Sequence, residues 1–373
     1  MRIDREKTMK INGRYLAHLL ALAILFGGGH AFAEPYLAVR MGLKCEACHV
    51  NPTGGGLRSD YGDVFAQTVL PAHPIHGDWG LWTGEVAKML RVGGDFRYDL
   101  NLTQTPHAKT TDQLEVQQGR VYAEAEVIPN RLIFYVDEQV APGIASNHEA
   151  YALFWSANHD WYVKAGQMYL PFGFRFEDQT AFVYDVSSIT MYSPDDALEF
   201  GWLHGHWDAQ FTVSEGTAAG AVPSSTGKQY GAQVSYVESG WRFGLTANDD
   251  DSPFARRKII GAFGGVHVGP VDFLGEVDSV ENEFAPPANV RQAAALLEAD
   301  WLVSAGNNLK LTLERYDPDR DVHDNRQTRV SLVYELTPIQ FLQLRAGVRD
   351  YDGPTGVDSQ NTRLFFIQLH AFF

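Results

Sequence analysis

The sequence is poor in cysteine, in basic residues and in long apolar runs, and each shortage excludes a class of protein. Its 373 residues include two cysteines, too few for a disulfide framework or for a structural zinc site with four thiolate ligands. Acidic residues outnumber basic ones by 46 to 30, and the formal net charge of −16 argues against nucleic acid as a partner. After residue 33, no apolar run is typical of a membrane-spanning helix.

The N-terminus has the pattern of an export signal. Basic residues between Arg2 and Arg14 precede the apolar run YLAHLLALAILF, which is too short to span a bilayer comfortably. The residues Ala31-Phe32-Ala33 then form a small-x-small cleavage site. We predict a signal peptide over residues 1–33; an uncleaved N-terminal membrane anchor is the alternative.

Both cysteines belong to one short motif, Cys45-Glu46-Ala47-Cys48-His49. C-x-x-C-H is the attachment sequence of a c-type haem. The spacing lets the two thiols add to the two vinyl groups of one porphyrin, and the next residue supplies an imidazole as the proximal iron ligand. We therefore predict one covalent haem c, bound through Cys45 and Cys48 with His49 as proximal ligand. A disulfide or a redox-active thiol pair is the alternative.

The segment around this motif is small. Residues 34–86 are expected to form a monohaem cytochrome c domain with a Gly-rich turn at residues 54–56 and a short helix after Ser59, ended by Pro71. About fifty residues cannot bury a large core alone. For the distal iron ligand we favour His76 or His73; Met41 and Met89 are further candidates, and a loop or packing role is the alternative for each.

The remaining chain, residues 87–373, alternates apolar and polar residues over stretches of about ten residues. Tight connections such as IPNR and ESGW alternate with longer ones such as DPDRDVHDN, and aromatic residues gather at the strand ends. These features predict a transmembrane antiparallel β-barrel of about sixteen strands, with short periplasmic turns and longer outer loops. The longest loop, Pro171 to Asp196, is expected to fold into the lumen. A soluble β-sandwich is the alternative.

The haem motif followed by a barrel resembles the fused monohaem cytochrome–porin family of the bacterial outer membrane, relatives of outer-membrane iron-oxidising cytochromes. The resemblance covers the mature chain, but only the motif is specific. It implies an outer-membrane electron-transfer protein, an electron carrier or an oxidoreductase. Its partners would be an extracellular donor or acceptor such as Fe(II), a periplasmic carrier such as a soluble cytochrome, and outer-membrane lipid. A solute porin with a haem-bearing plug or sensor and a haem enzyme such as a peroxidase are the alternatives. A charged lumen would suit the porin, with the basic residues Arg97, Arg120, Lys164, Arg345 and Arg349 facing the acidic residues Glu124, Glu126 and Glu276.

Overall fold

The computed structural model describes residues 34–75, 77, 80–216, 227–251, 255–284 and 289–373. The predicted signal peptide and His76, one of the two favoured distal ligands, lie outside the described residues. Three helical segments, α2 (Pro35–Met41), η1 (Cys45–Ala47) and α3 (Asp60–Thr68), precede the strands. Each helix in the described part of the chain is too short or too polar to cross a membrane.

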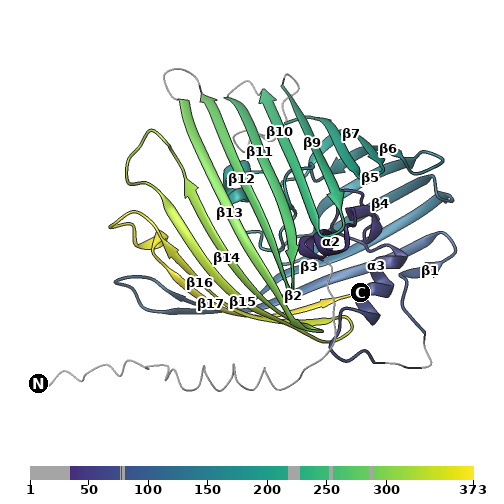
Figure 1. Ribbon diagram of the computed structural model, residues 1–373, viewed down its shortest axis with the longest axis horizontal. Helices are drawn as coiled ribbons and strands as arrows, with labels where there is room; N and C mark the ends of the chain where they lie inside the picture. The colour runs from purple at the N-terminus through teal and green to yellow at the C-terminus, as the bar shows by residue number, and fades with distance from the viewer. Residues whose placement is uncertain (1–33, 76, 78–79, 217–226, 252–254, 285–288) are drawn as a thin grey trace, which may run out of the picture.

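Sixteen antiparallel strands, β2 to β17, pair in chain order, and β17 pairs with β2, so the sheet closes into a barrel as predicted (Figure 1). A short strand, β1, adds to the end of β2. The strand bounds are β1 (Glu85–Ala87), β2 (Leu90–Gln104), β3 (Thr111–Ile128), β4 (Leu132–Ala141), β5 (Ser146–Trp155), β6 (Trp161–Met168), β7 (Asp195–His204), β8 (Trp207–Ser214), β9 (Lys228–Glu238), β10 (Trp241–Asp251), β11 (Ala255–Val268), β12 (Val271–Phe284), β13 (Asn289–Ser304), β14 (Asn307–Asp317), β15 (Gln327–Ile339), β16 (Leu342–Asp352) and β17 (Arg363–Phe372). A 3-10 turn, η3 (Asp358–Gln360), lies in the last loop.

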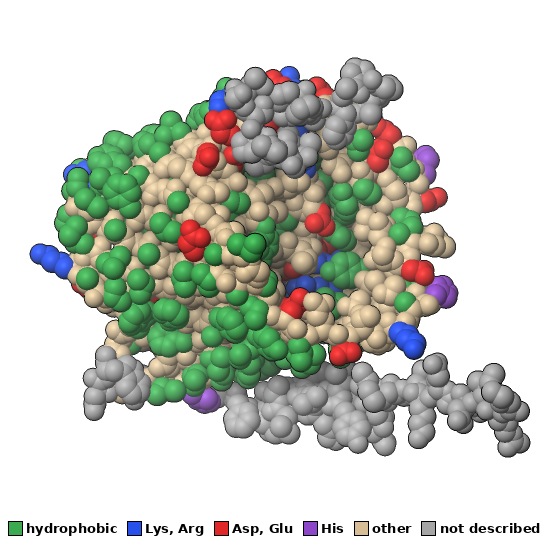
Figure 2. Space-filling view, turned by 180° about the vertical axis from the view of Figure 1, so that it is seen from behind, with side chains coloured by type: hydrophobic (Ala, Val, Ile, Leu, Met, Phe, Trp, Pro, Cys, Tyr) green, Lys and Arg blue, Asp and Glu red, His purple; other side chains and the backbone are tan. Residues whose placement is uncertain are grey.

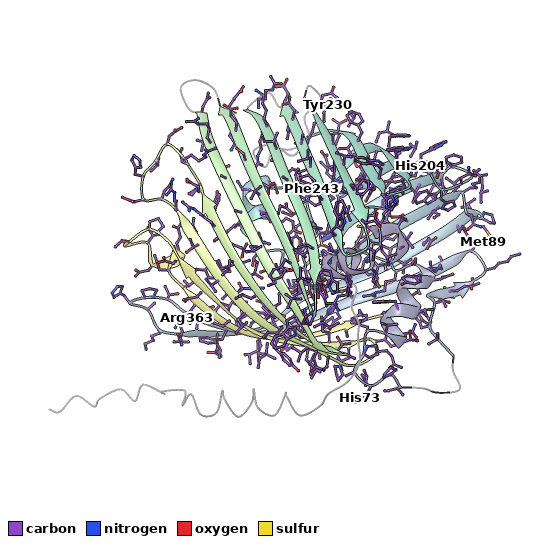
Figure 3. The ribbon with its side chains drawn as sticks, viewed as in Figure 1. His73, Met89, His204, Tyr230, Phe243 and Arg363 are labelled. Atoms are coloured by element: carbon purple, nitrogen blue, oxygen red, sulfur yellow. The ribbon has the colours of Figure 1, made fainter. Side chains whose placement is uncertain are left out.

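The alternation along each strand separates an apolar outer face from a polar lumen. In β10, the side chains of Trp241, Phe243 and Leu245 are exposed on the outside, whereas those of Arg242 and Thr246 are buried inside. Figure 2 shows hydrophobic side chains spread over the outer wall and charged side chains within a hollow, and Figure 3 labels Phe243 and Tyr230 on two neighbouring strands of that wall. This arrangement is the reverse of a soluble sandwich and suits a wall facing lipid.

The connections confirm the predicted alternation of short and long. Between β3 and β4, β9 and β10, and β15 and β16, the strands are joined by two or three residues. At the opposite end, residues 169–194 connect β6 to β7 and fold into the lumen as predicted. Within this inward loop, α4 (Phe182–Ser187) touches β12, β13 and β14. The backbone N–H groups of Phe174 and Phe182 donate to Glu276 and Glu314 of the wall, at 2.7 and 2.8 Å.

The N-terminal segment, residues 34–83, lies in the end of the barrel that carries the short turns (Figure 1). The N–H of Gly240, in the β9–β10 turn, donates to the carbonyl of Val39 in α2 at 3.1 Å. Tyr36, Val39 and Phe65 join one apolar core with residues of the inward loop and of the wall. This segment, which we call the plug, therefore shares its core with the barrel, as a chain of about fifty residues requires.

The two ends of the barrel-forming chain meet beside the plug. The terminal residue, Phe373, exchanges two backbone hydrogen bonds of 3.0 Å with Gly94 of β2. Its ring packs edge-on against Trp82, with ring centroids 6.1 Å apart. A Cβ on Gly94 would lie 2.7 Å from the Phe373 ring, so glycine is required for this close approach.

Candidate functional site

The haem-attachment motif forms a single turn held by its own backbone. The N–H groups of Cys48 and His49 donate to the carbonyl of Cys45 at 3.2 and 3.0 Å. The hydroxyl of Ser59 donates to the carbonyl of Ala47 at 2.7 Å and also accepts the N–H of Gly62, so Ser59 caps α3 as predicted. The two cysteine side chains are partly buried free thiols and form no disulfide with each other.

The Gly-rich turn lies against the motif. Gly54, Gly55 and Gly56 all have positive φ, between 66° and 89°. A Cβ on Gly54 would lie 3.5 Å from the Cys45 sulfur, and a Cβ on Gly56 would clash with the Tyr135 hydroxyl at 2.0 Å. Glycine therefore allows the chain to turn back closely over the thiols while touching the barrel wall.

Asn51, directly after the motif, anchors the plug to the barrel. Its Nδ2 donates to both carboxylate oxygens of Glu149 in β5, at 3.1 and 3.2 Å. Its Oδ1 accepts from Lys164 Nζ in β6 at 3.3 Å and from the Thr53 N–H at 3.2 Å. Asn51, Glu149 and Lys164 are each 0% exposed, so this contact is dry. Only a polar residue beside the motif pointed to this contact in the sequence.

A cavity opens in front of the motif, between the plug, the inward loop and the wall. The cavity contains about 1730 Å³ of space free of protein atoms, and part of this space is open to solvent. Cys45, Cys48 and His49 line it. So do five arginines drawn from the plug, the inward loop and three strands: Arg58, Arg97, Arg120, Arg175 and Arg242.

One of these arginines reaches the motif itself, and a second contacts the chain just after it. Arg175 of the inward loop donates to the Thr53 hydroxyl at 2.9 Å, and Arg242 Nη1 lies 3.9 Å from the Cys45 sulfur. Arg242 is held in turn by Asp208 at 3.0 Å. Arg120 was predictable as a lumen residue, whereas Arg58, Arg175 and Arg242 were not, because only the folded chain brings their three elements together.

Burial and the neighbouring arginines determine the protonation states of the His49 imidazole and of the two cysteine thiols. Burial, reinforced by Arg58 and Arg175, lowers the pKa of His49 to about 3, so its imidazole is neutral near pH 7. Its Nδ1 is buried and has no hydrogen-bond partner. Burial, with the neighbouring Cys45, raises the pKa of the Cys48 thiol to about 11. Burial also raises the pKa of Cys45, against an opposing effect of Arg242.

The structure does not bring His73 to the motif. Its backbone N–H donates to the carbonyl of Pro338 at 3.0 Å, its side chain is exposed, and it lies at the edge of the barrel beyond the plug (Figure 3). It is absent from the cavity lining. The hydrogen bond to Pro338 of β15 holds His73 away from the cavity, so in this conformation its side chain does not reach the motif, and its role as distal ligand stays a prediction. Met89 is 48% exposed at the start of β2 and is also remote.

Three other residues with ligand atoms do line the cavity. They are Met41 at the end of α2, Met191 of the inward loop and His370 of β17. His370 is engaged through both ring nitrogens, with Gln343 at 3.0 Å and with Asp95 at 2.6 Å. The two methionine sulfurs are therefore the more available ligand atoms within the described cavity lining. The sequence analysis named Met41 and missed Met191.

The charged lumen residues pair across neighbouring strands. The predicted set was Arg97, Arg120, Lys164, Arg345 and Arg349 facing Glu124, Glu126 and Glu276. In the structure Arg120 pairs with Asp137 instead, Lys164 with Glu199 at 3.1 Å, and Arg345 with Glu177 and Glu335 at 3.2 and 3.1 Å. The cations do line the lumen, but most of their partners come from other strands or from the inward loop.

The donor set fits a covalently attached haem. Two free thiols, a neutral imidazole with an unpartnered Nδ1 and a glycine turn without side chains all face one cavity. Neutral imidazole is the form that binds iron. The guanidinium groups of Arg58, Arg175 and Arg242 match the two propionates that a haem carries.

The barrel is similar to bacterial outer-membrane porins of known structure. An outer-membrane protein of Vibrio cholerae, OmpT with loop L8 deleted, superposes with a TM-score of 0.60 at 11% identity, over 76% of this chain and 99% of that chain. An anion-selective porin from Comamonas acidovorans gives 0.60 at 13% identity, over 76% and 99%. OprB of Pseudomonas putida gives 0.58 at 11% identity, over 77% and 94%. No family model and no curated protein match the sequence. The chain therefore has the fold of the porin class of barrels.

Proposed function

We propose that this protein transfers electrons across the outer membrane through one c-type haem, held by Cys45, Cys48 and His49 inside its barrel. Electrons would pass between an extracellular donor, for example Fe(II), and a periplasmic carrier such as a soluble cytochrome. The observation that carries the proposal is the location of the attachment motif: it faces a cavity within the barrel, among wall residues such as Arg242.

The depth of the plug supports this role. Glu149, which Asn51 contacts, lies seven residues before the β5–β6 turn begins at Ser156. At about 3.3 Å per residue and a strand tilt of about 40°, Asn51 lies roughly 18 Å above that turn. The apolar band of such a barrel is about 25 Å tall. From a redox group beside Asn51, electrons would therefore have to cross only a fraction of the thickness of the membrane to reach the other side.

The residues around the motif would hold such a group in one orientation. Cys45 and Cys48 would form the thioether bonds, and His49, kept neutral, would bind the iron. Arg58, Arg175 and Arg242 would neutralise the propionates. When bound, the haem supplies a one-electron acceptor and donor. Of the described cavity residues, Met41 and Met191 are the proposed sources of a distal ligand, and His76 also remains a proposal.

The filling of the lumen favours electron transfer over solute passage. The plug occupies the end with the short turns, and the inward loop crosses from the other end. Asp178 of that loop is bound to Arg329 of β15 and Arg349 of β16, at 2.9 and 3.0 Å. Opening a solute path would require breaking such pairs in a buried setting, which costs several kcal/mol.

The apolar outer wall supports an outer-membrane location with lipid around the barrel. The side chains of Phe200, Leu245 and Val277 are 47%, 51% and 54% exposed on the outside, where water would contact them in a soluble protein. The end with the short turns and the plug would face the periplasm, which is where a haem is attached to exported chains.

The second candidate is a solute porin in which the plug serves as a sensor. It is favoured by the likeness to porins, one of them anion-selective, and by the guanidinium groups that line the cavity. An anion attracted by Arg97, Arg120 and Arg242 would enter the same space. In this reading, movement of the plug would open the barrel.

Reconstitution into liposomes distinguishes the two candidates. The holoprotein is incorporated into liposomes that contain a soluble cytochrome, and Fe(II) is added outside. We expect reduction of the enclosed cytochrome with the wild type and none with the Cys45→Ala/Cys48→Ala variant, which keeps the barrel without covalent haem. The same preparations are tested in planar bilayers. Large ion conductance of the wild type, together with no reduction of the enclosed cytochrome, would favour the porin.

A further inference from the structure

A row of oxygen-bearing side chains crosses five strands of the lumen wall. Successive cross-strand partners in this row link β8 to β9, β9 to β10, β10 to β11 and β11 to β12. All its side chains lie on the lumen face, and at β11 the position is a glycine. The members, in order, are Gln210, Gln233, Thr246, Gly261 and Asp278.

Gly261 creates the space in which the carboxylate at the end of this row lies. A Cβ at residue 261 would be 2.2 Å from Asp278 Oδ1 and 2.8 Å from Thr246 Cγ2. The Asp278 carboxylate therefore extends over β11 towards Thr246, along the row and in the direction of the cavity. Any larger residue at position 261 would displace it.

No basic side chain of the described residues pairs with Asp278. It is 4% exposed, and apart from a side-chain contact with Glu276 its carboxylate oxygens have no hydrogen-bond partner. Glu276, two residues earlier on the same face, is 2% exposed and accepts only the N–H of Phe174. The two carboxylates repel each other when both are charged. An isolated buried charge costs several kcal/mol, so such a pair requires a cation or a proton.

Several other buried carboxylates of the described lumen are paired with a cation. Asp137 pairs with Arg120, and Glu199 pairs with Lys164. Even the cluster of Glu34, Glu177 and Glu335, whose oxygens lie within 4.8 Å of one another, contains Lys310 Nζ, 2.5 Å from Glu34. That cluster is thus already filled, whereas no ion pair joins Glu276 or Asp278 to a basic side chain in the described part of the chain.

The other end of the row presents free oxygens to the cavity. Gln210 Nε2 donates to Asp208, which can only accept, so the Gln210 amide is fixed with Oε1 turned away from it. Gln210 Oε1 and Gln233 Oε1 are buried without partners. Both residues line the cavity of the haem motif. The row therefore joins an uncompensated carboxylate pair to the proposed redox site through unpaired oxygen atoms.

We propose that this row binds a small divalent cation of the hard class, with Asp278 and Glu276 as anionic ligands and Gln233 as a neutral oxygen ligand nearer the cavity. Hard divalent cations take carboxylate and amide oxygens. The relevance of this site to electron transfer rests on the proposed function, under which a cation held there would lie on the lumen wall beside the haem.

Binding is tested with Mn²⁺ alone, which needs no electron transfer. The detergent-solubilised holoprotein is titrated with Mn²⁺, and free Mn²⁺ is measured by its paramagnetic resonance signal. We expect one tight site in the wild type. Asp278→Asn and Glu276→Gln should each weaken it about tenfold or more, because each removes one anionic ligand. Asp321→Asn, which removes an exposed outer-loop carboxylate paired with Arg291, is the control and should leave the site unchanged.

A second variant tests the geometry without changing charge. Gly261→Ala places a methyl group where Asp278 Oδ1 lies, so Mn²⁺ should bind about tenfold more weakly or worse at constant charge. Heat-dependent migration on gels confirms that each variant barrel has folded. Absence of Mn²⁺ binding to the wild type, as expected if the pair shares a proton, or equal weakening by Asp321→Asn, would overturn the proposal. Tight Mn²⁺ binding without Fe(II)-dependent reduction would support the site and contradict the electron-transfer function.

Discussion

The contact between Asn51 and the wall offers a quantitative test of how the plug is held. Asn51→Ala removes the amide that joins the plug to Glu149 and Lys164 at a buried position, yet it leaves Cys45, Cys48 and His49 unchanged. The variant therefore addresses the seating of the plug separately from attachment of the haem.

The magnitude follows from the partners that lose a bond. In the variant, Glu149 still accepts the N–H of Tyr169 at 3.1 Å, and Lys164 still pairs with Glu199 at 3.1 Å. Each charged group therefore retains one partner. Hydrogen bonds to charged groups contribute about 1.5–3 kcal/mol each. Loss of two such bonds predicts a cost of about 3–5 kcal/mol. At about 1.4 kcal/mol per factor of ten, opening of this segment should become at least about a hundredfold more frequent.

Amide hydrogen exchange measures this opening directly. Exchange of residues 50–57 should accelerate by about a hundredfold or more in Asn51→Ala, while exchange in the strands stays as in the wild type. Asn325→Ala, which removes an outer-loop amide bonded to the carbonyl of Asp319 at 2.8 Å, is the matched control. If exchange of residues 50–57 changed by less than tenfold, or changed equally in both variants, the anchor assigned to Asn51 would be refuted.

Three further predictions follow from the site and the topology. The Cys45→Ala/Cys48→Ala variant should carry no covalent haem, and persistence of haem staining on a denaturing gel would contradict the attachment. An epitope tag at Asp319 should be accessible on intact cells, and a tag at Asn130 should not. The opposite labelling would contradict the predicted orientation of the barrel in the membrane. Burial, partly opposed by nearby arginines, raises the pKa of Asp63 in α3 to about 6 from an ordinary value near 4. Because the folded state binds this proton more tightly, α3 should lose stability as the pH rises from about 4 to 6. Faster exchange of residues 60–68 across this pH range would show it, and Asp63→Asn should flatten the dependence.

The barrel was predictable because its signals are local. Alternation in β10 and the tight turn at Ser239 and Gly240 depend on residues that are neighbours in sequence, and both predictions are confirmed. The cap at Ser59 is equally local and was found for the same reason. The inward loop was identified by its length alone.

Partners across the lumen were not predictable, because they depend on register. Arg120 was expected to face the acidic set of Glu124, Glu126 and Glu276, but its ion-pair partner is Asp137 of the neighbouring strand β4, which is directly opposite Tyr122. The position of His73 was unpredictable for the same reason, since its partner Pro338 is 265 residues further along the chain. One sequence contains no information on such pairings until the strands are aligned, so the arginines around the haem motif became visible only in the folded chain.

The meeting of Phe373 with Gly94 and Trp82 has a consequence for how the molecule is assembled. The plug precedes every wall strand along the chain and β17 follows all the others, so we expect the plug to be in place when β17 pairs. The final pairing, of β17 with β2, is completed beside the plug and touches Trp82 at its edge. The wall therefore closes around a segment that belongs to the lumen. On the proposed function, a haem attached to Cys45 and Cys48 before β17 pairs with β2 would be built into the lumen with the plug, whereas a chain that closed first would receive it only through the open mouth of the cavity.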